Sequence, residues 1–504
     1  MDHPFHDTVC CGTVSASSLL LPISAHLKET RFGGFLRVFT MRIEVVRSEG
    51  LAALSYFVSS EGEAFVVDPR RDASIYASLS AAANATIRYV FETHRNEDYV
   101  TGSLEVQDLE PDAEICHSDA TSFKFGEHSV ADGETFTVGN MRVTCINTPG
   151  HTDDSMCYAV ADLSVGPDPV VVFTGDTLFV SEVGRTDLVD ISKHAEMSHK
   201  LYDSLHEKVL KLDDGVIVYP GHGAGSVCGG DIGDREFTTI GIERKHNRWL
   251  QMDEDSFVSA KLAQTLTRAQ YFKHCERLNT SGPPLLRQVT PPRPIDTSEM
   301  RSLLSEVDHR VIDVREPAEF LEGHIPGTVS LSLSNMGLLA GWVLSPDQSF
   351  SFVLGNTKDG HAESLELARA YLTRIGFDNV LGYLEGGLHS WTESGGALDS
   401  IPVVSVETLK VGVDSGNTLI LDVREEHEYV KEHIEGSLSL PLTHIHSVDL
   451  GIVERRLVAP LCPSGYRSTT ATSLLRQRAS VGAVVFLEGL KGWRLRGYPV
   501  VQGA

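Results

Sequence analysis

The sequence has little of three features on which whole classes of protein depend. Its 504 residues include only eight cysteines, and these lack the spacing of a metal knuckle or a disulfide framework. No stretch reaches the roughly 18 apolar residues of a membrane-spanning helix. Lysine and arginine number 43 against 69 acidic residues, which gives a net charge of -26. These shortages disfavour a disulfide scaffold, a membrane protein and a nucleic-acid-binding protein, and we expect a cytoplasmic location.

The length is sufficient for about three domains. Residues 1–40 are an extension, because the first expected strand begins at Met41. The extension has no secretory apolar core, and its acidic residues are atypical of a transit peptide. It is either the product of an upstream start site or a disordered tail, and it carries no readable function.

Regular apolar patterns follow the extension. They predict strands at 42–47, 53–59 and 64–68. A helix is expected at 71–84, before the strand that leads to the first polar motif. A further helix is expected at 253–279. The proline-rich stretch over 281–297 predicts a stiff linker, so the first domain should span 41–280.

Four polar motifs in this first domain each place a His or Asp on a turn after an apolar run. They are Thr93–Tyr99, Thr148–Thr152, Phe173–Phe179 and Tyr219–Gly223. Their order resembles the metal motifs of the metallo-β-lactamase fold, and four such motifs over about 130 residues are far more specific than one. The resemblance implies an α/β domain in which two sheets pack between helices, an αββα sandwich.

Two histidines of that pattern are missing. In the family the first motif reads His-x-His-x-Asp-His, whereas here Asn96 and Tyr99 replace the second and third histidines. The resemblance then implies that each of two metal sites has lost one imidazole, which disfavours a two-zinc centre. His94, His151 and Asp176 remain. Two histidines and one carboxylate form the facial triad of non-haem Fe(II) enzymes.

The resemblance narrows to the sulfur dioxygenase, or persulfide dioxygenase, branch of the fold. It implies one Fe(II) held by those three residues, with zinc as the alternative metal because affinity alone does not select iron. Asp98 and His222 are expected to hold water or support the ligands. A protein that keeps the fold and binds no metal is the alternative.

Two other residues of the first domain, Arg185 and Cys228, are candidates for a role at this site. Arg185 matches a segment of sulfur dioxygenases and is expected to bind the carboxylate of a thiol such as glutathione. The alternative is an ion pair with a local acid such as Asp187. Cys228, which follows the last motif, is interpreted as an incidental loop cysteine.

The rest of the chain contains an internal repeat. Asp313–Glu316 recurs as Asp422–Glu425, and each copy ends with a Glu-Gly pair near a tryptophan. The order resembles two rhodanese domains, each a small α/β unit with a parallel sheet, over 298–400 and 402–502. The Asp-Val-Arg elements are expected to be structural.

The two copies differ where chemistry would occur. The second has Cys462 at the end of an apolar run and before a helical segment, a context in which loop N–H groups, the helix N-terminus and Arg467 favour a thiolate. We expect Cys462 to be catalytic and to carry sulfane sulfur, and Gly465 and Arg467 to bind its substrate. An inert buried thiol is the alternative. The first copy has no cysteine, so a packing or docking role is expected for it.

Together the domains predict a persulfide dioxygenase coupled to rhodanese-type sulfur transfer. It would use O₂ to oxidise a low-molecular-weight persulfide, such as glutathione persulfide, to sulfite, and it could combine sulfur with sulfite to form thiosulfate. No nucleic-acid or membrane partner is expected, and a homo-oligomer is compatible with the sequence. The alternatives are a thioester hydrolase of the same fold with two metals, and a metal-free sulfur carrier that uses Cys462 alone.

Overall fold

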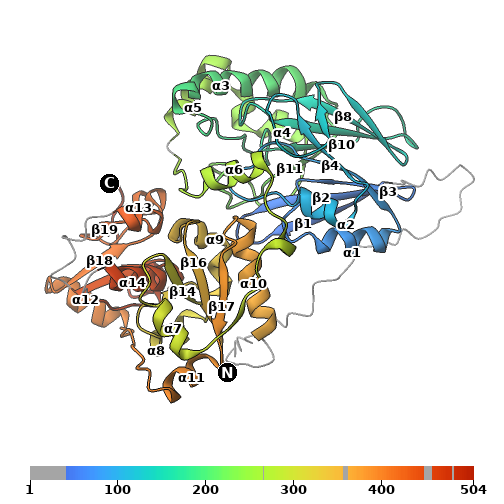
Figure 1. Ribbon diagram of the computed structural model, residues 1–504. Helices are drawn as coiled ribbons and strands as arrows, with labels where there is room; N and C mark the ends of the chain where they lie inside the picture. The colour runs from blue at the N-terminus through green and yellow to red at the C-terminus, as the bar shows by residue number, and fades with distance from the viewer. Residues whose placement is uncertain (1–40, 265, 356–360, 448–456, 479–481, 504) are drawn as a thin grey trace, which may run out of the picture. The chain divides into compact units, whose positions relative to one another are not determined.

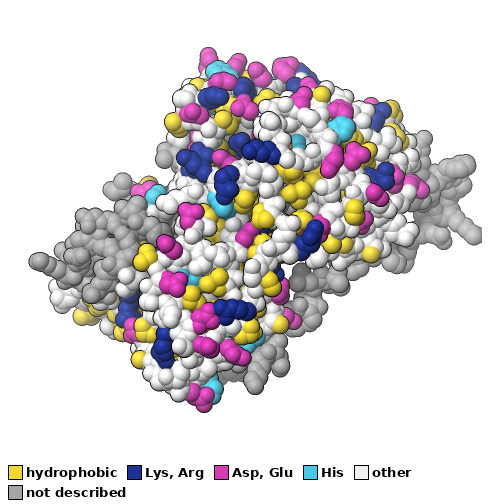
Figure 2. Space-filling model, in the orientation of Figure 1, with side chains coloured by type: hydrophobic (Ala, Val, Ile, Leu, Met, Phe, Trp, Pro, Cys, Tyr) yellow, Lys and Arg dark blue, Asp and Glu magenta, His cyan; other side chains and the backbone are white. Residues whose placement is uncertain are grey.

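The computed structural model describes residues 41–503 except 265, 356–360, 448–456 and 479–481. The chain divides into the units Met1–Val38 and Phe39–Ala504, and only the second holds described residues. The predicted extension therefore lies outside the described part. Among the described residues, no helix has the length and apolar character needed to cross a membrane. Asp and Glu side chains are spread over the face that Figure 2 shows, in keeping with the net charge of -26.

Two six-stranded sheets form the first half of the unit. One contains β1 (Arg42–Ser48), β2 (Ala53–Ser60), β3 (Glu63–Val67), β4 (Thr86–Phe91), β5 (Glu114–Ser118) and β6 (His128–Val130), paired in chain order. The other contains β7 (Thr135–Val138), β8 (Met141–Asn147), β9 (Met156–Asp162), β10 (Val171–Gly175), β11 (Ile217–Pro220) and β12 (Thr238–Thr239), also paired in chain order.

The core of this half lies between the two sheets. Phe65 packs edge-on against Phe91 within the first sheet, at a ring distance of 5.5 Å, and against Phe173 of the second sheet at 6.1 Å. Five helices cover the outer faces (Figure 1). On the first sheet lie α1 (Ser74–Ala83) and α2 (Ser103–Leu109), and on the second lie α3 (His194–Asp203), α4 (Ile240–His246) and α5 (Glu254–Ala263). The αββα prediction is confirmed.

The predicted strands and the helix at 71–84 are confirmed within a few residues, but the single helix expected at 253–279 is wrong. Helix α5 ends at Ala263, and α6 (Phe272–Ser281) is a separate helix. The carbonyls of Leu266 and Thr267, between the two helices, accept hydrogen bonds from the Arg185 guanidinium at 3.2 and 3.3 Å. A continuous helix would use those carbonyls itself. A tertiary contact therefore holds the break in place.

The second part of the unit contains a five-stranded parallel sheet. Its strands in spatial order are β13 (Arg293–Ile295), β17 (Val380–Leu384), β16 (Ser349–Val353), β14 (His309–Asp313) and β15 (Val329–Ser330). Its helices are α7 (Thr297–Leu303), α8 (Pro317–Glu322), α9 (Leu333–Val343), α10 (His361–Arg374) and α11 (Gly387–Glu393). Because β13 lies inside the stretch expected to be a linker, 281–297, that stretch is partly a strand of this sheet.

The third part repeats this plan with fewer strands. Its parallel sheet has the order β19 (Leu438–Ser439), β18 (Thr418–Asp422) and β20 (Leu457–Leu461), with helices α12 (Val406–Asp414), α13 (Glu426–Lys431), α14 (Tyr466–Arg478) and α15 (Gly489–Leu495). Short 3-10 or π helices elsewhere are Ile191–Lys193, Ser204–Lys208, Val209–Lys211, Arg248–Gln251, Leu286–Gln288 and Leu442–Ser447.

The Asp-Val-Arg elements have the same structural role in both copies. Arg315 binds the carboxylate of Asp313, with Nη2 and Oδ2 2.6 Å apart, and Arg424 binds Asp422 at the same distance. All four side chains are buried. These pairs fix the turn after β14 in one copy and after β18 in the other, which agrees with the structural role expected from the sequence.

Two buried arginines join the first half of the unit to helix α10 and the turn after it. The guanidinium of Arg71 donates to both carboxylate oxygens of Asp378, at 2.6 and 2.8 Å, and to the carbonyl of Thr373 at 2.9 Å. In the reverse direction, Arg374 donates to both oxygens of Asp72 at 2.9 and 2.8 Å. The two pairs hold α10 against the segment between β3 and α1.

Replacing Arg71 with alanine should lower the free energy of unfolding by about 2–3 kcal/mol, because Asp378 and the carbonyl of Thr373 lose a buried donor. Arg88→Ala is the control, since the Arg88 side chain is 46% exposed and lies 3.8 Å from Glu63. It should change stability by less than about 0.5 kcal/mol. Denaturant unfolding measures the free energy of unfolding of both variants. Equal losses of stability in the two variants would contradict the role assigned to Arg71.

Candidate functional sites

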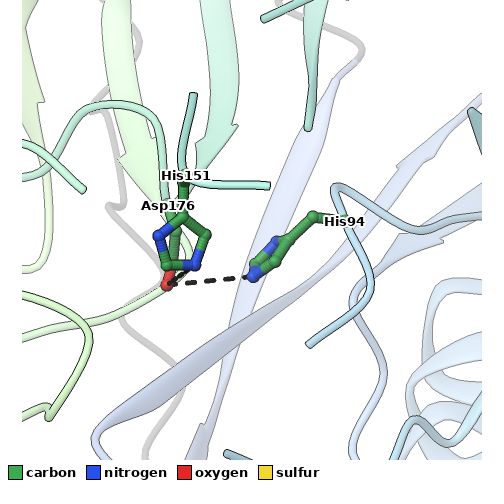
Figure 3. Close-up of side chains that lie close together, drawn as sticks. All are labelled: His94, His151 and Asp176. Carbon is green, nitrogen blue, oxygen red and sulfur yellow. Dashed lines mark ion pairs between the residues drawn. The ribbon is translucent and has the colours of Figure 1, made fainter. Parts of the chain in front are cut away.

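Three motif side chains meet at one edge of the sandwich (Figure 3). His94 follows β4 of the first sheet, His151 follows β8 of the second, and Asp176 follows β10. The Nε2 atoms of His94 and His151 lie 3.9 and 3.4 Å from Oδ2 of Asp176. The three ligand atoms all lie within 4.8 Å of one another, and all three side chains are buried. The motif order predicts this meeting of strand ends, and the structure places the residues there.

A glycine permits the close approach of these strand ends. Gly175 has a φ of +48°, and a Cβ added to it would lie 2.4 Å from Oγ1 of Thr93. Only glycine fits this combination of positive φ and contact. The turn that carries Asp176 can therefore lie directly against Thr93, the neighbour of His94.

Hydrogen bonds fix the ring of His94 so that Nε2 faces the cluster. The Thr93 hydroxyl donates its one hydrogen to Oδ2 of Asp68 at 2.7 Å. The Thr93 oxygen, 2.9 Å from Nδ1 of His94, must then accept from Nδ1–H. In the neutral ring the free lone pair is on Nε2, which has no hydrogen-bond partner.

The other two side chains are fixed in the same way. Nδ1 of His151 donates to the backbone carbonyl of Arg185 at 2.9 Å, so its Nε2 also faces the cluster. Oδ1 of Asp176 pairs with Nδ1 of His222 at 2.7 Å, which leaves Oδ2 without a partner. Buried polar atoms without partners are rare. Two imidazole nitrogens and a carboxylate oxygen that face one another fit the donor set of a transition-metal ion.

Burial and neighbouring charges have opposing effects on the pKa values in this cluster. Burial lowers the pKa of His94, and the nearby His151 adds to the effect. Burial also opposes protonation of His151, but Glu97 and Asp176 outweigh it and raise the pKa of His151 to about 9. Burial would raise the pKa of the Asp176 carboxyl, yet His222 and the two other histidines hold it below its usual value.

His222 has no ring nitrogen free. Its Nδ1 lies 2.7 Å from Asp176, and its Nε2 lies 3.0 Å from Oδ2 of Asp98. Burial opposes its protonation, but these two carboxylates hold the pKa of His222 well above its ordinary value. In this arrangement His222 supports Asp176 and Asp98, and both of its ring nitrogens are hydrogen-bonded to carboxylates.

The residues that replace the missing histidines belong to the scaffold. The amide of Asn96 donates to the backbone carbonyl of His94 at 3.3 Å. Tyr99 lies with its ring 6.2 Å from that of His222. Asn279 of α6 donates to the backbone carbonyls of both Asn96 and Tyr99 at 2.7 Å. The motif loop is thus anchored from behind by α6.

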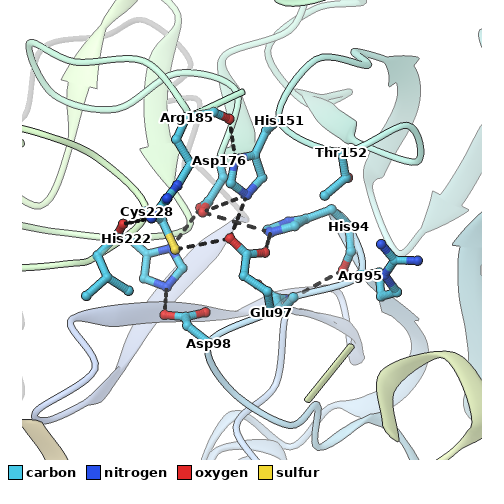
Figure 4. Close-up of polar contacts among 12 residues, drawn as sticks. His94, Arg95, Glu97, Asp98, His151, Thr152, Asp176, Arg185, His222 and Cys228 are labelled. Atoms are coloured by element: carbon cyan, nitrogen blue, oxygen red, sulfur yellow. Dashed lines mark hydrogen bonds and ion pairs between the residues drawn. The ribbon is translucent and has the colours of Figure 1, made fainter. Parts of the chain in front are cut away.

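Sequence reasoning missed two residues at this site (Figure 4). The buried carboxylate of Glu97 has Oε1 3.3 Å from Nε2 of His151 and Oε2 3.9 Å from Nε2 of His94. Cys228 is fully buried, and its Sγ lies 3.6 Å from Oε1 of Glu97. Burial, with Asp98 and Glu97 nearby, raises the pKa of the Cys228 thiol well above its ordinary value. Cys228 is part of the site, so its interpretation as an incidental loop residue is wrong.

The structure also corrects the role expected for Arg185. Its guanidinium is buried and pairs with both oxygens of Asp187 at 2.7 Å. Its remaining N–H groups donate to the carbonyls of Val227, Leu266 and Thr267. All five donors are used within the chain, so none is left for a substrate carboxylate. The ion pair with Asp187, which is the alternative offered by the sequence, is the arrangement found.

Cys462 lies in a loop that holds its sulfur with backbone N–H groups. Sγ accepts from the N–H of Gly465 at 3.1 Å and from that of Ser468 at 3.4 Å. Gly465 has a φ of +86°, which favours glycine. Arg467 donates to both oxygens of Glu428, at 2.6 and 3.0 Å, and so binds a carboxylate of the chain. Gly465 therefore stabilises the sulfur directly, while the charge of Arg467 is shared with Glu428.

Comparisons with known proteins match family models to the parts of the chain that hold these residues. The Metallo-beta-lactamase superfamily model matches residues 49–222, and the Rhodanese-like domain model matches residues 296–394 and 405–496. The mitochondrial hydroxyacylglutathione hydrolase of Saccharomyces cerevisiae is 33% identical over 143 residues, which are 26% of this chain and 48% of that protein. The mitochondrial persulfide dioxygenase of Bos taurus is 27% identical over 213 residues, 41% and 74% of the two chains. The chain spans about half the length of the first curated relatives, at 45% and 48%.

A solved structure extends the likeness beyond the first domain. The crystal structure of a metallo-beta-lactamase from Staphylococcus aureus subsp. aureus COL is 26% identical, with a TM-score of 0.60. The match covers 68% of this chain and 98% of that one. This share exceeds the part matched by the lactamase model, so the likeness includes elements that follow it.

The purified protein should contain one metal ion per chain, and His151→Ala should reduce the content at least about tenfold, because one of three ligand atoms is lost. His128→Ala is the matched control, since His128 is partly exposed and pairs with Glu134 away from the cluster. Elemental analysis measures the metal in all three proteins. Equal content in the two variants would refute the assigned cluster.

Proposed function

Because the chain joins a metallo-beta-lactamase domain to two rhodanese-like domains, we propose that it is a persulfide dioxygenase with a sulfurtransferase centre. The observation that carries the proposal is the set of unpaired buried atoms on His94, His151 and Asp176. It is a facial triad, the ligand set of non-haem iron enzymes. The likeness to the bovine persulfide dioxygenase and the rhodanese domains support sulfur metabolism as its setting.

The proposed cofactor is one Fe(II), with zinc as the alternative. Bound there, iron would supply the redox chemistry by which O₂ oxidises the outer sulfur of a persulfide to sulfite. The chain orients the two imidazoles through Thr93 and the backbone of Arg185 and excludes water by burying the cluster. Glu97 and the Cys228 thiol place a polar wall beside it.

The substrate proposed for this centre is an anionic thiol persulfide such as glutathione persulfide. A cavity of about 860 Å³ opens beside Arg95, the neighbour of His94. Its lining includes the basic residues Arg95, Lys124, Arg268, Lys273 and Arg277 and the acidic residues Asp187, Asp190 and Glu276. The excess of basic groups complements carboxylates on the substrate, so these residues replace Arg185 as the expected carboxylate-binding groups.

Cys462 is proposed to carry sulfane sulfur between small molecules. The N–H groups of Gly465 and Ser468 stabilise its thiolate. The outer sulfur of a Cys462 persulfide can pass to sulfite, which forms thiosulfate and regenerates the thiolate.

The six cysteines in the described residues are buried free thiols, which suits a reducing compartment such as the cytoplasm.

A thioester hydrolase remains the second candidate, because relatives named hydroxyacylglutathione hydrolase match the first domain. A two-metal centre would need ligands beyond the triad. One candidate set that shares no residue with the triad is Asp98, His222 and Cys228. The hydrogen bonds of His222 to two carboxylates count against that set, so we rank the hydrolase second.

Asp176→Ala should lower O₂ uptake with glutathione persulfide by at least about 100-fold, because it removes a ligand and the partner of His222. Asp132→Ala, which changes a carboxylate paired with Lys208 on the surface, should keep the wild-type rate. An oxygen electrode gives both rates. Full uptake by Asp176→Ala, or thioester hydrolysis without uptake by the wild type, would count against the dioxygenase.

Cys462→Ser should abolish sulfur transfer from thiosulfate to cyanide, since a hydroxyl cannot form the persulfide. Persulfide-dependent O₂ uptake should stay within about twofold of wild type, because the triad is untouched. Cys275→Ser is the control, because Cys275 is another buried thiol, whose Sγ donates to the carbonyl of Ile375 and not to the Cys462 loop. Thiocyanate formation is the readout, and retained transfer would place the active thiol elsewhere.

A further inference from the structure

A second cavity, of about 650 Å³, lies against the Cys462 loop. Ser464 and Arg467 of that loop form one wall. Leu338 and Trp342 of α9, in the cysteine-less rhodanese domain, contribute another. Asp231 and Ile232, in the loop that follows β11 of the first domain, contribute a third. The cavity is therefore assembled from all three domains of the unit Phe39–Ala504.

Cys462 directly precedes two residues of the cavity lining. It is 1% exposed, and its Sγ accepts from the N–H groups of Gly465 and Ser468. The next two residues, Pro463 and Ser464, both line the cavity. The cavity therefore lies beside the loop that holds the sulfur.

The size and the apolar lining fit an organic molecule better than an inorganic ion alone. Cavities of about 300–1,000 Å³ typically enclose small organic ligands. Leu338, Leu339, Trp342 and Ile232 give the lining an apolar surface. An ion the size of sulfite would leave most of this surface without a contact.

The charge of the lining narrows the ligand further. Asp231 and Glu425 are acidic members of the lining, and Arg467 is its one Lys or Arg among the described residues. Arg467 is already bound to Glu428. This lining disfavours a ligand with several carboxylates or phosphates. In the balance of charged side chains, this lining is the opposite of the cavity beside Arg95, where basic residues outnumber acidic ones.

We propose that this cavity is the acceptor site of the Cys462 persulfide and takes a low-molecular-weight thiol whose body is neutral or positively charged. The acceptor thiolate attacks the outer sulfur of the Cys462 persulfide. An S–S bond to the acceptor forms as the S–S bond to Cys462 breaks, and the electron pair stays on Cys462 as thiolate. The proton of the acceptor thiol passes to solvent, and no external oxidant or reductant is needed. The proposal rests on the sulfurtransferase function proposed for Cys462.

Asp231→Lys tests this assignment because Asp231 is exposed and belongs to the first domain, outside the catalytic loop. Asp234→Lys is the matched control: the same charge change at an exposed position of the same loop, outside the lining. Full-length protein is first loaded with sulfur from thiosulfate. Single-turnover transfer is then measured to cysteamine, 2-mercaptoethanol and 2-mercaptoethanesulfonate, which share a two-carbon body and differ in charge.

The ratio of the cysteamine rate to the sulfonate rate should fall by about fivefold in Asp231→Lys, the effect of reversing one partly solvated charge. Asp234→Lys should keep the wild-type ratio, and Asp231→Asn should give an intermediate value. Because each ratio compares the same two thiols, their intrinsic reactivities cancel. Equal ratios in Asp231→Lys and Asp234→Lys would overturn the acceptor site.

Transfer to cyanide separates this result from failure of the proposed function. Cyanide is small enough to reach the outer sulfur without the apolar wall, so its rate should be similar in all four proteins. If the wild type transfers no sulfur to cyanide, the sulfurtransferase function itself fails. If cyanide reacts normally and none of the three thiols accepts sulfur, the function stands and the acceptor site is wrong.

Discussion

Much of the first domain is arranged around three buried atoms that lack partners, Nε2 of His94, Nε2 of His151 and Oδ2 of Asp176. A buried polar atom without a hydrogen bond costs on the order of 1–3 kcal/mol. The three atoms face one another within 4.8 Å, so a single cation bound there would contact all of them. The other polar atom of each side chain is hydrogen-bonded: Nδ1 of His94 to Thr93, Nδ1 of His151 to the Arg185 carbonyl, and Oδ1 of Asp176 to His222. These hydrogen bonds fix the orientation of the three side chains. The constraint therefore links metal binding to the backbone of four separate strand ends.

That geometry depends on parts of the chain far from the ligands. The loop that carries Glu97 and Asp98 is held by Asn279 of α6, and the N–H of Val100 donates to the carbonyl of Arg374 in α10 at 2.7 Å. Helix α10 belongs to the rhodanese domain without a cysteine. This domain, which has no cysteine, thus supports the loop of the candidate metal cluster on one side and contributes to the lining of the cavity beside the Cys462 loop on another. Its retention has a physical reason that does not require catalysis.

The sequence predicts those parts of the molecule that depend on local pattern. The motifs that resemble the metallo-β-lactamase pattern predict that His94, His151 and Asp176 lie together. The αββα layers and the two parallel sheets are likewise what the two resemblances imply, while apolar periodicity predicts the first strands and the helix at 71–84. What could not be predicted depends on tertiary partners. Arg185 has an acid two residues away and carbonyls more than forty residues away, and no pattern reveals that all five of its donors are used. The same contact explains why a helix expected at 253–279 is broken. Glu97 was missed because it occupies a variable position of the motif, where the orientation of the side chain is unknown until the loop is built.

One loop borders both candidate sites. Residues Gly225–Val227 and Gly229–Ile232 are among those that line the cavity beside the Cys462 loop. In the same loop, the buried Cys228 lies against Glu97 beside the candidate metal ligands, and the carbonyl of Val227 accepts from Arg185. The two cavities differ in charge: basic side chains outnumber acidic ones beside Arg95, and acidic ones outnumber basic ones beside Asp231. Under the proposed function, a single thiol would not suit both cavities equally well, so the arrangement favours two distinct small-molecule partners.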